Sequence, residues 1–476
     1  MTVQKIASDY DRATLVPRIL HFGFGAFGRA HPIVYLEDGM NKAGGDFGVI
    51  AVRLNSGAEE LTALDDADGL YTVAEVDGSG VTARKIGAVI GTCHPRRDGI
   101  DTLLGYFAAA KMAIVALTIT EKGYCISSGA LDLDNKGIRA DLETPDQPKT
   151  AIGVIVAGLA LRRQKGLGGL TILSCDNLPD NGQLAKIAIL TFAERLDPAL
   201  AAWISENCTF PVTMVDRIVP ALDEHGRKLI QDLNDGVEDP NGIVCEPFRQ
   251  WVIEDHFAGD VPPYEASGAM LVDDVTPFEM MKLRMLNGSH TFLAMLGGLA
   301  GHETIAACME DGLFRTAALT LMLAEQRPTL PDLPGVDTNA YATSLIERFS
   351  NPELKHRTAQ IAWDTSQKLP QRILQSVVIH LERGTDWKLL ALTIAGWCHF
   401  LEEAADKGAK INDHLADQLL TLAGDYTGAA LIERLAAIEQ IFPPALATSH
   451  AFKQAVLEAY DAITDKGPRG AVEAAL

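Results

Sequence analysis

Apolar runs alternate with helix-like patterns along the first half of the chain. The segment 29–44 (RAHPIVYLEDGMNKAG) has apolar residues at helical spacing, and residues 71–89 (YTVAEVDGSGVTARKIGAV) place an Asp-Gly turn signal between two strand-like runs. Four short apolar runs are typical of buried strands with polar groups near their C-terminal ends: RILHFGFG (18–25), FGVIAVRL (47–54), KMAIVALTIT (111–120) and GLTILSCDN (169–177). This alternation predicts βαβ units around a largely parallel sheet, with a hairpin inserted over 71–89.

The pattern changes after about residue 277, where apolar residues recur almost only at helical spacing. Amphipathic helices are predicted for AALTLMLAEQ (317–326), DWKLLALTIAGWCHFLEEAA (386–405), DHLADQLLTLAGDY (413–426) and AALIERLAAIEQIF (429–442). The fold class we expect is therefore an α/β N-terminal domain followed by an all-α C-terminal domain. The domain limits we predict are 1–277 and 278–476.

Composition limits the kinds of binding partner and the cellular compartment that we expect for the protein. A chain of 476 residues is long enough for two domains, and its formal charge of −22 argues against binding to nucleic acid, whose phosphates would be repelled. No run approaches the about 18 apolar residues of a membrane span, and the N-terminus lacks a secretory pattern. The seven cysteines include no C-x-x-C pair, which fits reduced thiols. We expect a cytoplasmic protein without a membrane partner.

A glycine cluster follows the first predicted strand and opens the first predicted helix. Gly23, Gly25 and Gly28 have the G-x-G-x-x-G spacing that lets a backbone turn tightly and approach a pyrophosphate, with the N-terminus of the next helix facing the phosphates. A structural glycine turn is the alternative. The position in the first βα unit favours a dinucleotide site. Its predicted residues are Gly23, Phe24, Gly25, Ala26, Phe27 and Gly28.

The end of the second predicted strand bears on which cofactor is bound. An acidic residue there would bind the ribose hydroxyls of NAD, but the sequence reads AVRLNSGAEE (51–60). Arg53 would suit the 2′-phosphate of NADP, and Asn55 would suit a ribose hydroxyl. We expect NAD, with NADP left open.

The segment EMMKLRMLNGSH (279–290) carries the strongest candidate chemistry of the second half. In a helix, Glu279, Lys282 and Asn287 would share roughly one side, with His290 one turn beyond Asn287. A buried lysine can act as a general acid or base, and an asparagine can stabilise an oxygen on which negative charge develops. A surface helix with an ordinary Glu-Lys pair is the alternative.

Two further segments place polar residues after strand-like runs. Asp176 and Asn177 follow the run 169–175, and Asp216 and Arg217 follow a β-rich run in PVTMVDRIVPA (211–221). Ligands of open α/β sheets collect where strands end, so we expect both segments at the same edge of the sheet. Turn or helix-cap roles are the alternative.

Together these segments resemble the mannitol dehydrogenase family of polyol-specific long-chain dehydrogenases, which includes the fructuronate reductases, or mannonate oxidoreductases. The motifs that carry the resemblance run in one order along nearly the whole chain: GFGAFGRAH (23–31), TITEKGY (118–124), SCDNLPDNG (174–182), TMVDRIVP (213–220), PFRQWVIED (247–255), MKLRMLNGSH (281–290) and QIAWDTSQKLPQR (360–372). The resemblance implies a Rossmann-type N-terminal domain, a helical C-terminal domain, and metal-independent hydride transfer with a nicotinamide cofactor.

The resemblance also assigns roles to individual residues. It implies that Lys282 is the catalytic lysine, that Asn177 and Asn287 hold the reacting oxygen, and that Glu279 passes protons between the lysine and water. His290 would orient the substrate, and Asp216 and Lys368 would line its pocket. No metal ligands are implied.

The chain departs from the family pattern at two places. Gly28 stands where many members carry histidine, and Gln360 stands eight residues before Lys368, where mannitol-type members carry arginine. The segment HRTAQIAWDTSQKLPQR (356–372) is closer to the fructuronate reductase branch, whose sugar-acid substrate needs a cation for its carboxylate. Lys368, Arg357 or Arg372 would supply it.

The function we expect is a secondary-alcohol dehydrogenase of carbohydrate metabolism that interconverts a keto sugar acid and its hydroxy form. A mannitol or arabinitol 2-dehydrogenase acting on neutral polyols is the first alternative. A non-catalytic dinucleotide-binding regulator is the second, but such a protein would have no need for Lys282, Asn177 and Asn287 together.

Overall fold

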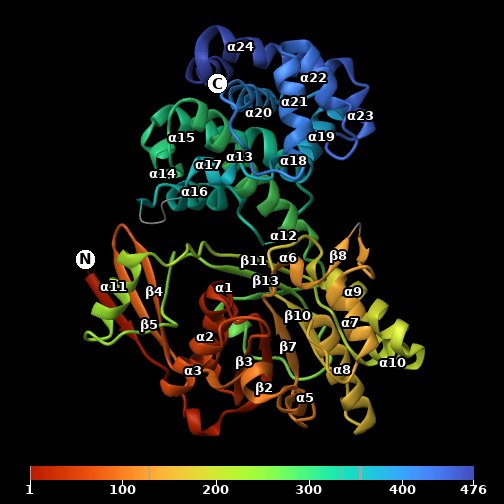
Figure 1. The fold of residues 1–476 in the computed structure, drawn as a ribbon. Coiled ribbons are helices and arrows are strands. Elements are labelled where there is room, and N and C mark those ends of the chain that lie inside the picture. Colours follow the sequence, from red (N-terminus) through yellow and green to blue (C-terminus); the bar gives the residue numbers. More distant parts are fainter. Residues whose placement is uncertain (1, 128, 334, 353–355) are drawn as a thin grey trace. The chain divides into compact units, whose positions relative to one another are not determined.

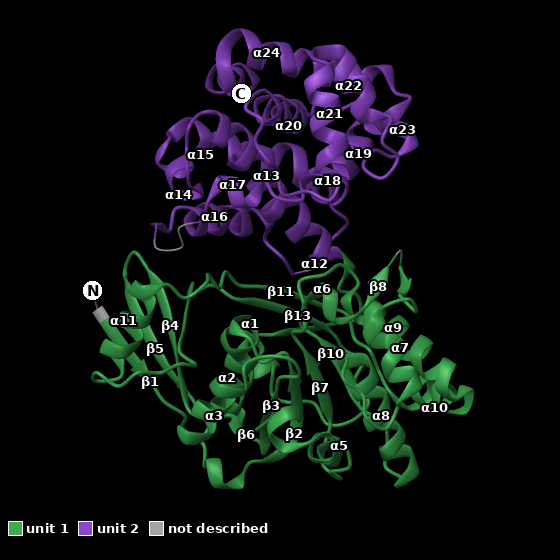
Figure 2. Ribbon diagram, viewed as in Figure 1, with its two compact units in different colours: residues 1–276 green, residues 277–476 purple. Residues whose placement is uncertain are grey.

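The computed structural model describes residues 2–127, 129–333, 335–352 and 356–476. The chain divides into two compact units, Met1–Thr276 and Pro277–Leu476 (Figure 2). Unit 1 contains all the named strands of the described chain, and in unit 2 the regular structure of the described residues is helical. The α/β N-terminal and all-α C-terminal classes expected from the sequence are thereby confirmed. Among the described residues, no helix is both long and apolar enough to cross a membrane.

A five-stranded parallel sheet forms the centre of unit 1 (Figure 1). Its order is β10-β7-β2-β3-β6, so β2 lies in the middle and the chain moves outward first through β3 and β6, then through β7 and β10. This is the strand order of dinucleotide-binding α/β folds. The strand bounds are β2 (Val16–Phe22), β3 (Phe47–Val52), β6 (Val89–Cys93), β7 (Ile114–Leu117) and β10 (Thr171–Ser174).

Both faces of this sheet are buried. Neighbouring residues Ile19 and Leu20 of β2 belong to different hydrophobic clusters, because successive side chains of a strand point to opposite faces. The Leu20 cluster includes side chains from α5, α8 and α9, and the Ile19 cluster includes side chains from α2 and α3. The helices of unit 1 are α1 (Ala26–Ala30), α2 (Pro32–Ala43), α3 (Ala58–Asp66), α4 (Pro95–Asp98), α5 (Ile100–Phe107), α6 (Thr120–Gly123), α7 (Lys136–Glu143), α8 (Ala151–Gln164), α9 (Asn181–Leu196), α10 (Pro198–Asn207) and α11 (Glu224–Leu233).

The helix predicted over 29–44 is interrupted at His31. Helix α1 ends at Ala30, His31 has the non-helical angles φ −121° and ψ −81°, and α2 begins at Pro32. Proline has no N–H to donate and disfavours helical angles at the preceding residue, while it suits the first position of a new helix.

The predicted hairpin is present, in a second sheet. Strand β4 (Tyr71–Asp77) pairs antiparallel with β5 (Gly80–Ile86), within the order β1-β5-β4-β12. The bounds of its outer strands are β1 (Thr2–Ile6) and β12 (Ile243–Cys245).

The expectation that Asp216 ends a strand of the central sheet was wrong. Asp216 is the last residue of β11 (Thr213–Asp216), which belongs to a separate sheet of order β11-β13-β14. Strand β11 pairs antiparallel with β13 (Gln250–Glu254), and β13 pairs with β14 (Met270–Val272). A pairing with a partner so distant in sequence leaves no local signal in the β11 segment. A short hairpin of β8 (Ile126–Ser127) and β9 (Ala130–Leu131) completes the strands.

Unit 2 contains the long helices predicted from the amphipathic pattern. The helices are α12 (Thr276–Met281), which begins at the unit boundary, α13 (Ser289–Phe292), α14 (Ile305–Glu310), α15 (Gly312–Thr320), α16 (Thr338–Phe349), α17 (Thr358–Ile361), α18 (Thr365–Leu369), α19 (Gln375–Arg383), α20 (Lys388–Asp406), α21 (Ala416–Asp425), α22 (Gly428–Ala436), α23 (Pro444–Ala447) and α24 (His450–Ala475). In the described part of unit 2, four π-helical segments are inserted among them: η3 (Lys282–Gly288), η4 (Leu293–Gly297), η5 (Leu321–Gln326) and η8 (Pro370–Leu374). π-Helical turns are rare and occur frequently at functional sites.

Candidate active site

A cleft of about 370 Å³ opens in unit 1 where the central strands end. Its lining comes from the turns after β2, β7 and β10. In the sheet, β3 lies on one side of β2 and β7 lies on the other. The strand order therefore reverses at β2, and the cleft opens at this point. Open α/β sheets bind their ligands at this point. The lining residues are Gly23, Gly25, Ala26, Phe27, Gly28, Thr118, Thr120, Glu121, Cys175, Asp176, Asn177 and Leu178.

The glycines of the first turn are required by close contacts. Gly23 has φ +72°, and a Cβ built on it would lie 2.2 Å from the backbone oxygen of Thr118. A Cβ on Gly28 would lie 2.6 Å from Nε2 of His21. Neither position accepts a side chain without rearrangement, and Gly25 caps α1. The turn therefore leaves the exposed backbone and small surface that a pyrophosphate needs, so the residues present fit a dinucleotide.

The opposite wall of the cleft is held by a buried carboxylate. Asp176 accepts the backbone N–H groups of Ile119 (3.0 Å) and Thr120 (2.9 Å) and the hydroxyl of Tyr124 (2.7 Å). Thr120 has a positive φ of 62°, a conformation that is uncommon for residues other than glycine. Burial is the largest effect on the pKa of Asp176 and raises it, against these hydrogen bonds. Asp176 thus fixes the loop after β7.

Three other predicted cofactor residues, Phe24, Arg53 and Asn55, are not among the residues that line the cleft. Phe24 is fully buried in the core, so its side chain does not line the cleft. Arg53 donates from Nε to the carbonyl oxygen of Phe24 at 3.0 Å and thereby ties the end of β3 to the glycine turn. Asn55 is exposed on the connection between β3 and α3.

Asn177 and Asp216 are both in unit 1, on different sheets. Asn177 lines the cleft after β10. Asp216 is buried at the end of β11, opposite Gln250 of β13. The neighbouring Arg217 forms a buried ion pair with Glu75 at 2.5 Å, so it serves the core of unit 1.

In unit 2, the predicted catalytic segment is helical but changes from α to π geometry. Glu279 lies in α12, Lys282 and Asn287 lie in η3, and His290 lies in α13. In an α-helix, residues five apart are rotated by about 140° around the axis. A π-helix bonds residue i to i+5, which puts Lys282 and Asn287 one turn apart on the same side. Lys282 and Glu279 are buried, with 6% and 9% of their surface exposed.

His290 is a neutral, buried imidazole. Burial lowers its pKa well below the ordinary value, and the neighbouring His356, Arg372 and Arg348 lower it further. Its ring packs on Phe349 with centroids 4.3 Å apart. Its Nε2 atom is buried without a hydrogen-bond partner among the described residues.

Lys368 and Arg357 occupy different environments. Lys368 donates from Nζ to the carbonyl oxygens of Ile361 (3.1 Å) and Trp363. Burial, followed by the charge of Arg372, lowers the pKa of Lys368 to about 8. Arg357 is exposed and precedes α17.

Several residues at these sites were not predicted from the sequence. Thr118, Thr120 and Glu121 line the cleft of unit 1, and His356 and Phe349 surround His290 in unit 2. For the first three, the signal was their position at the end of a predicted strand. For His356 and Phe349, contact with His290 depends on tertiary packing, which no local pattern indicates.

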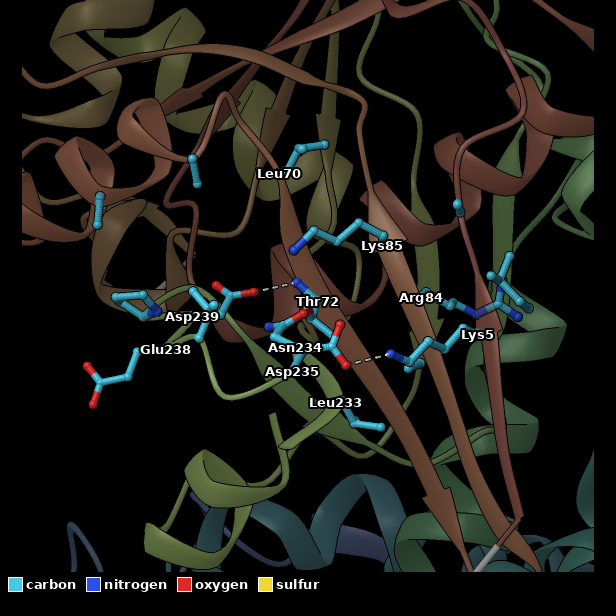
Figure 3. Close-up of a pocket in the computed structure, with 17 residues that line it drawn as sticks. Lys5, Leu70, Thr72, Arg84, Lys85, Leu233, Asn234, Asp235, Glu238 and Asp239 are labelled. Atoms are coloured by element: carbon cyan, nitrogen blue, oxygen red, sulfur yellow. Dashed lines mark hydrogen bonds and ion pairs between the residues drawn. The ribbon is translucent and has the colours of Figure 1, made fainter. Parts of the chain in front are cut away.

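A second hollow of unit 1, of about 520 Å³, lies beside the sheet β1-β5-β4-β12 (Figure 3). Lys5 faces Asp235 across it at 3.6 Å, and Asp239 accepts the backbone N–H of Thr72 at 2.8 Å. None of the predicted site residues lines this hollow. Charged groups of both signs line it, so it offers no concentrated charge of one sign to a ligand.

Two family models match the chain and together cover most of it. Residues 17–266 match the mannitol dehydrogenase Rossmann domain, and residues 274–464 match the mannitol dehydrogenase C-terminal domain. Among curated proteins, the D-mannonate oxidoreductase of Escherichia coli strain K12 is 47% identical over 98% of this chain and 97% of its own length.

Solved structures of similar proteins share the fold. A D-sorbitol dehydrogenase in substrate-free form matches with a TM-score of 0.91 and 32% identity, over 98% of this chain and 97% of the other. The Pseudomonas fluorescens mannitol 2-dehydrogenase, solved as a ternary complex with NAD and D-mannitol, matches with a TM-score of 0.82 and 33% identity, over 99% and 96%. With both halves of its sequence and its fold accounted for in this way, the chain belongs to the mannitol dehydrogenase family of oxidoreductases.

Proposed function

We propose that the protein is an NAD-dependent, metal-independent dehydrogenase that interconverts a keto sugar acid and its hydroxy form, of the fructuronate/mannonate type. The observation that carries the proposal is that Lys282 and Asn287 lie five residues apart in the π-helical segment η3, a spacing that corresponds to about one π-turn. A buried amine beside an amide is the pair that moves a proton to an oxygen and stabilises that oxygen during the transfer.

The cleft after β2, β7 and β10 is the proposed cofactor site. Gly23 and Gly28 let the turn pack closely on Thr118 and His21, which supports a backbone path suited to a pyrophosphate. Thr118 and Glu121 also line the cleft. NAD is the cofactor seen with the Pseudomonas fluorescens relative, which supports it over NADP here. When bound, the nicotinamide supplies or accepts the hydride at the substrate carbon.

The residues of the chain would handle the proton and the charge. In reduction, Lys282 as an ammonium gives its proton to the carbonyl oxygen at C5 of a keto-hexuronate, or at C2 of a ketohexose. Asn287 and Asn177 are the amides that we assign to stabilising the negative charge that develops on the substrate during reduction. In oxidation, neutral Lys282 removes the hydroxyl proton and Glu279 passes it to water. His290 and Asp216 orient the substrate hydroxyls, and Lys368 and Arg357 add positive charge for an acidic substrate.

Two relatives support different substrates. The Escherichia coli relative is named a D-mannonate oxidoreductase, which supports a sugar acid. The Pseudomonas fluorescens relative binds D-mannitol, which supports the alternative of a neutral polyol. The higher identity and nearly complete coverage of the first relative favour the sugar acid. We place the reaction in the cytoplasm, since all seven cysteines are free thiols, as a reducing compartment would keep them.

A substrate panel tests the proposal. The purified protein is incubated with NAD or NADP and with D-mannonate, D-mannitol or D-arabinitol, and reduced cofactor is followed by its absorbance. We expect D-mannonate with NAD to give the highest kcat/KM. A higher kcat/KM for D-mannitol would support the polyol alternative, and cofactor binding without turnover of any substrate would support a regulator.

A further inference from the structure

A cluster of cationic and imidazole side chains in unit 2 has more hydrogen-bond donors than partners. It consists of Arg372 in η8, Lys368 in α18, His290 in α13, and His356. Arg372 and Arg348 both lower the pKa of His290, Lys368 lowers that of His356, and Arg372 lowers that of Lys368, so these groups lie within electrostatic reach of one another.

Arg372 is the least satisfied member of the cluster. Among the described residues, its side chain makes one hydrogen bond, from Nη1 to the hydroxyl of Thr291 at 3.3 Å. A guanidinium has five N–H donors. Burial lowers the pKa of Arg372 to about 10, and no carboxylate of the described chain opposes that shift. Arg372 is half-buried, and a partly desolvated cation that no described carboxylate pairs with is costly unless a ligand supplies the anion.

The backbone of Arg372 adjoins the proposed catalytic segment. Segment η8 packs against η3, and a Cβ built on Gly288 would lie 2.9 Å from the carbonyl oxygen of Arg372. Glycine at 288 therefore allows the two π-helical segments to approach closely, directly after Asn287. The bond from Arg372 to Thr291 connects its side chain to the residue after His290.

The two histidines add unused donors at the same place. Nε2 of His290 and Nδ1 of His356 are buried without partners in the described part of the chain, and the two rings lie 5.0 Å apart at 79°. Because burial lowers both pKa values, each ring is neutral and can present one N–H. The cluster thus offers a planar guanidinium and neutral donors to an anion with several oxygens.

We propose that Arg372 binds the carboxylate of the sugar-acid substrate and selects acids over neutral polyols, with His290 beside it. The inference rests on the proposed function and names the residue that gives it its substrate class. An arginine binds a carboxylate through two parallel hydrogen bonds, a geometry that a lysine cannot reproduce. Lys368 already donates to two backbone carbonyls, so Arg372 is the better placed of the two cations.

The test compares an acid with its neutral isostere. Wild type, Arg372→Met and Arg372→Lys are assayed with D-mannonate and with D-mannonamide, in which an amide replaces the carboxylate. The matched control is Arg434→Met, which removes an exposed arginine of α22. We expect wild type to prefer the acid, and Arg372→Met to lose about 100-fold in kcat/KM for the acid while changing little for the amide. The kcat/KM of Arg372→Lys for the acid should lie between those of wild type and Arg372→Met, and the values for Arg434→Met should match wild type.

Binding and stability measurements separate this inference from the proposed function. The affinity for D-mannonate is measured by calorimetry, and the thermal midpoint is measured without ligand. Removal of a half-buried cation that no described carboxylate pairs with should leave the midpoint unchanged or higher, whereas a structural role would lower it. The inference is overturned if Arg372→Met keeps its preference for the acid, if acid and amide weaken equally as the midpoint falls, or if wild type does not bind the acid. If wild type binds the acid in an Arg372-dependent way but turns over no sugar acid, the proposed function fails and the inference stands.

Discussion

The carboxylate of Asp176, two residues after β10, accepts the backbone N–H of Thr120, the first residue of α6, at 2.9 Å. Two loops that are far apart in sequence are thereby joined along one wall of the cleft in unit 1. In the sequence, Asp176 could equally be a turn or helix-cap residue. In the structure, it holds together two loops at the proposed cofactor site.

The variant Asp176→Asn should weaken both this loop and cofactor binding. The amide keeps one acceptor oxygen, so one of the N–H groups of Ile119 and Thr120 would be left buried and unpaired. We expect a loss of about 2 kcal/mol in unfolding free energy and a higher Kd for NADH. Denaturant unfolding and fluorescence titration measure the two effects. Unchanged NADH affinity in a destabilised variant would show that the loop does not contribute to the cofactor site.

The variant Gly23→Ala should disrupt the glycine turn. Its Cβ would meet the backbone oxygen of Thr118 at 2.2 Å, which a side-chain adjustment cannot relieve. We expect a destabilisation of about 3 kcal/mol together with loss of NADH binding. Gly166→Ala is the control, since Gly166 has a similar φ of +66° with nothing within 4 Å of its Cβ. The control should lose about 1 kcal/mol and keep NADH binding. Equal effects of the two variants would argue against a close approach at Gly23.

Much of this architecture could be predicted from the sequence. The alternation of apolar runs and helical patterns indicates the parallel sheet, and the glycine spacing after β2 indicates the turn that the structure shows. The residues after the strand 169–175 were also expected at the cleft, and Asp176 and Asn177 line it. These features follow from periodicity and from backbone demands that act over a few residues.

Other features depend on contacts between distant segments. Strand β11 has the apolar pattern of a central strand, but its antiparallel pairing with β13 puts Asp216 in another sheet. The change from α to π geometry at Lys282 depends on how η3 packs against η5 and η8, since Gly288 meets Gln326 and Arg372. We expected Lys282 and Asn287 on roughly one side of a helix, but in a regular α-helix residues five apart diverge by about 140°. The expected arrangement therefore depends on the π geometry, which residue spacing does not indicate.

A buried glutamate should make the stability of unit 2 depend on pH. Glu325 accepts the backbone N–H groups of Leu389 and Leu390, at the start of α20, at 2.9 Å each. Burial raises its pKa from 4.5 to about 7. The folded state therefore binds more protons than the unfolded chain between these values, and the stability that Glu325 contributes below pH 4.5 is lost as pH rises through about 7.

The variant Glu325→Gln tests this sign. Between pH 5 and pH 7.5, titration of this group should lower the unfolding free energy of wild type by up to about 3 kcal/mol. The variant lacks the titrating carboxyl and should not show this loss. Thermal midpoints of both proteins are measured at the two pH values, with Glu439→Gln, at an exposed glutamate, as the control. The thermal midpoint of Glu325→Gln should therefore rise relative to that of wild type as pH rises. A constant or opposite difference would contradict the assignment.

The central claim is that the amine of Lys282 transfers the proton that accompanies hydride transfer. The most direct measurement is kcat for D-mannonate oxidation by Lys282→Ala, together with its Kd for NADH, with Lys410→Ala at an exposed lysine as the control. The account predicts a kcat about 1,000-fold below wild type, NADH affinity close to that of wild type, and a control with unchanged values. Turnover by Lys282→Ala near the wild-type rate would contradict it.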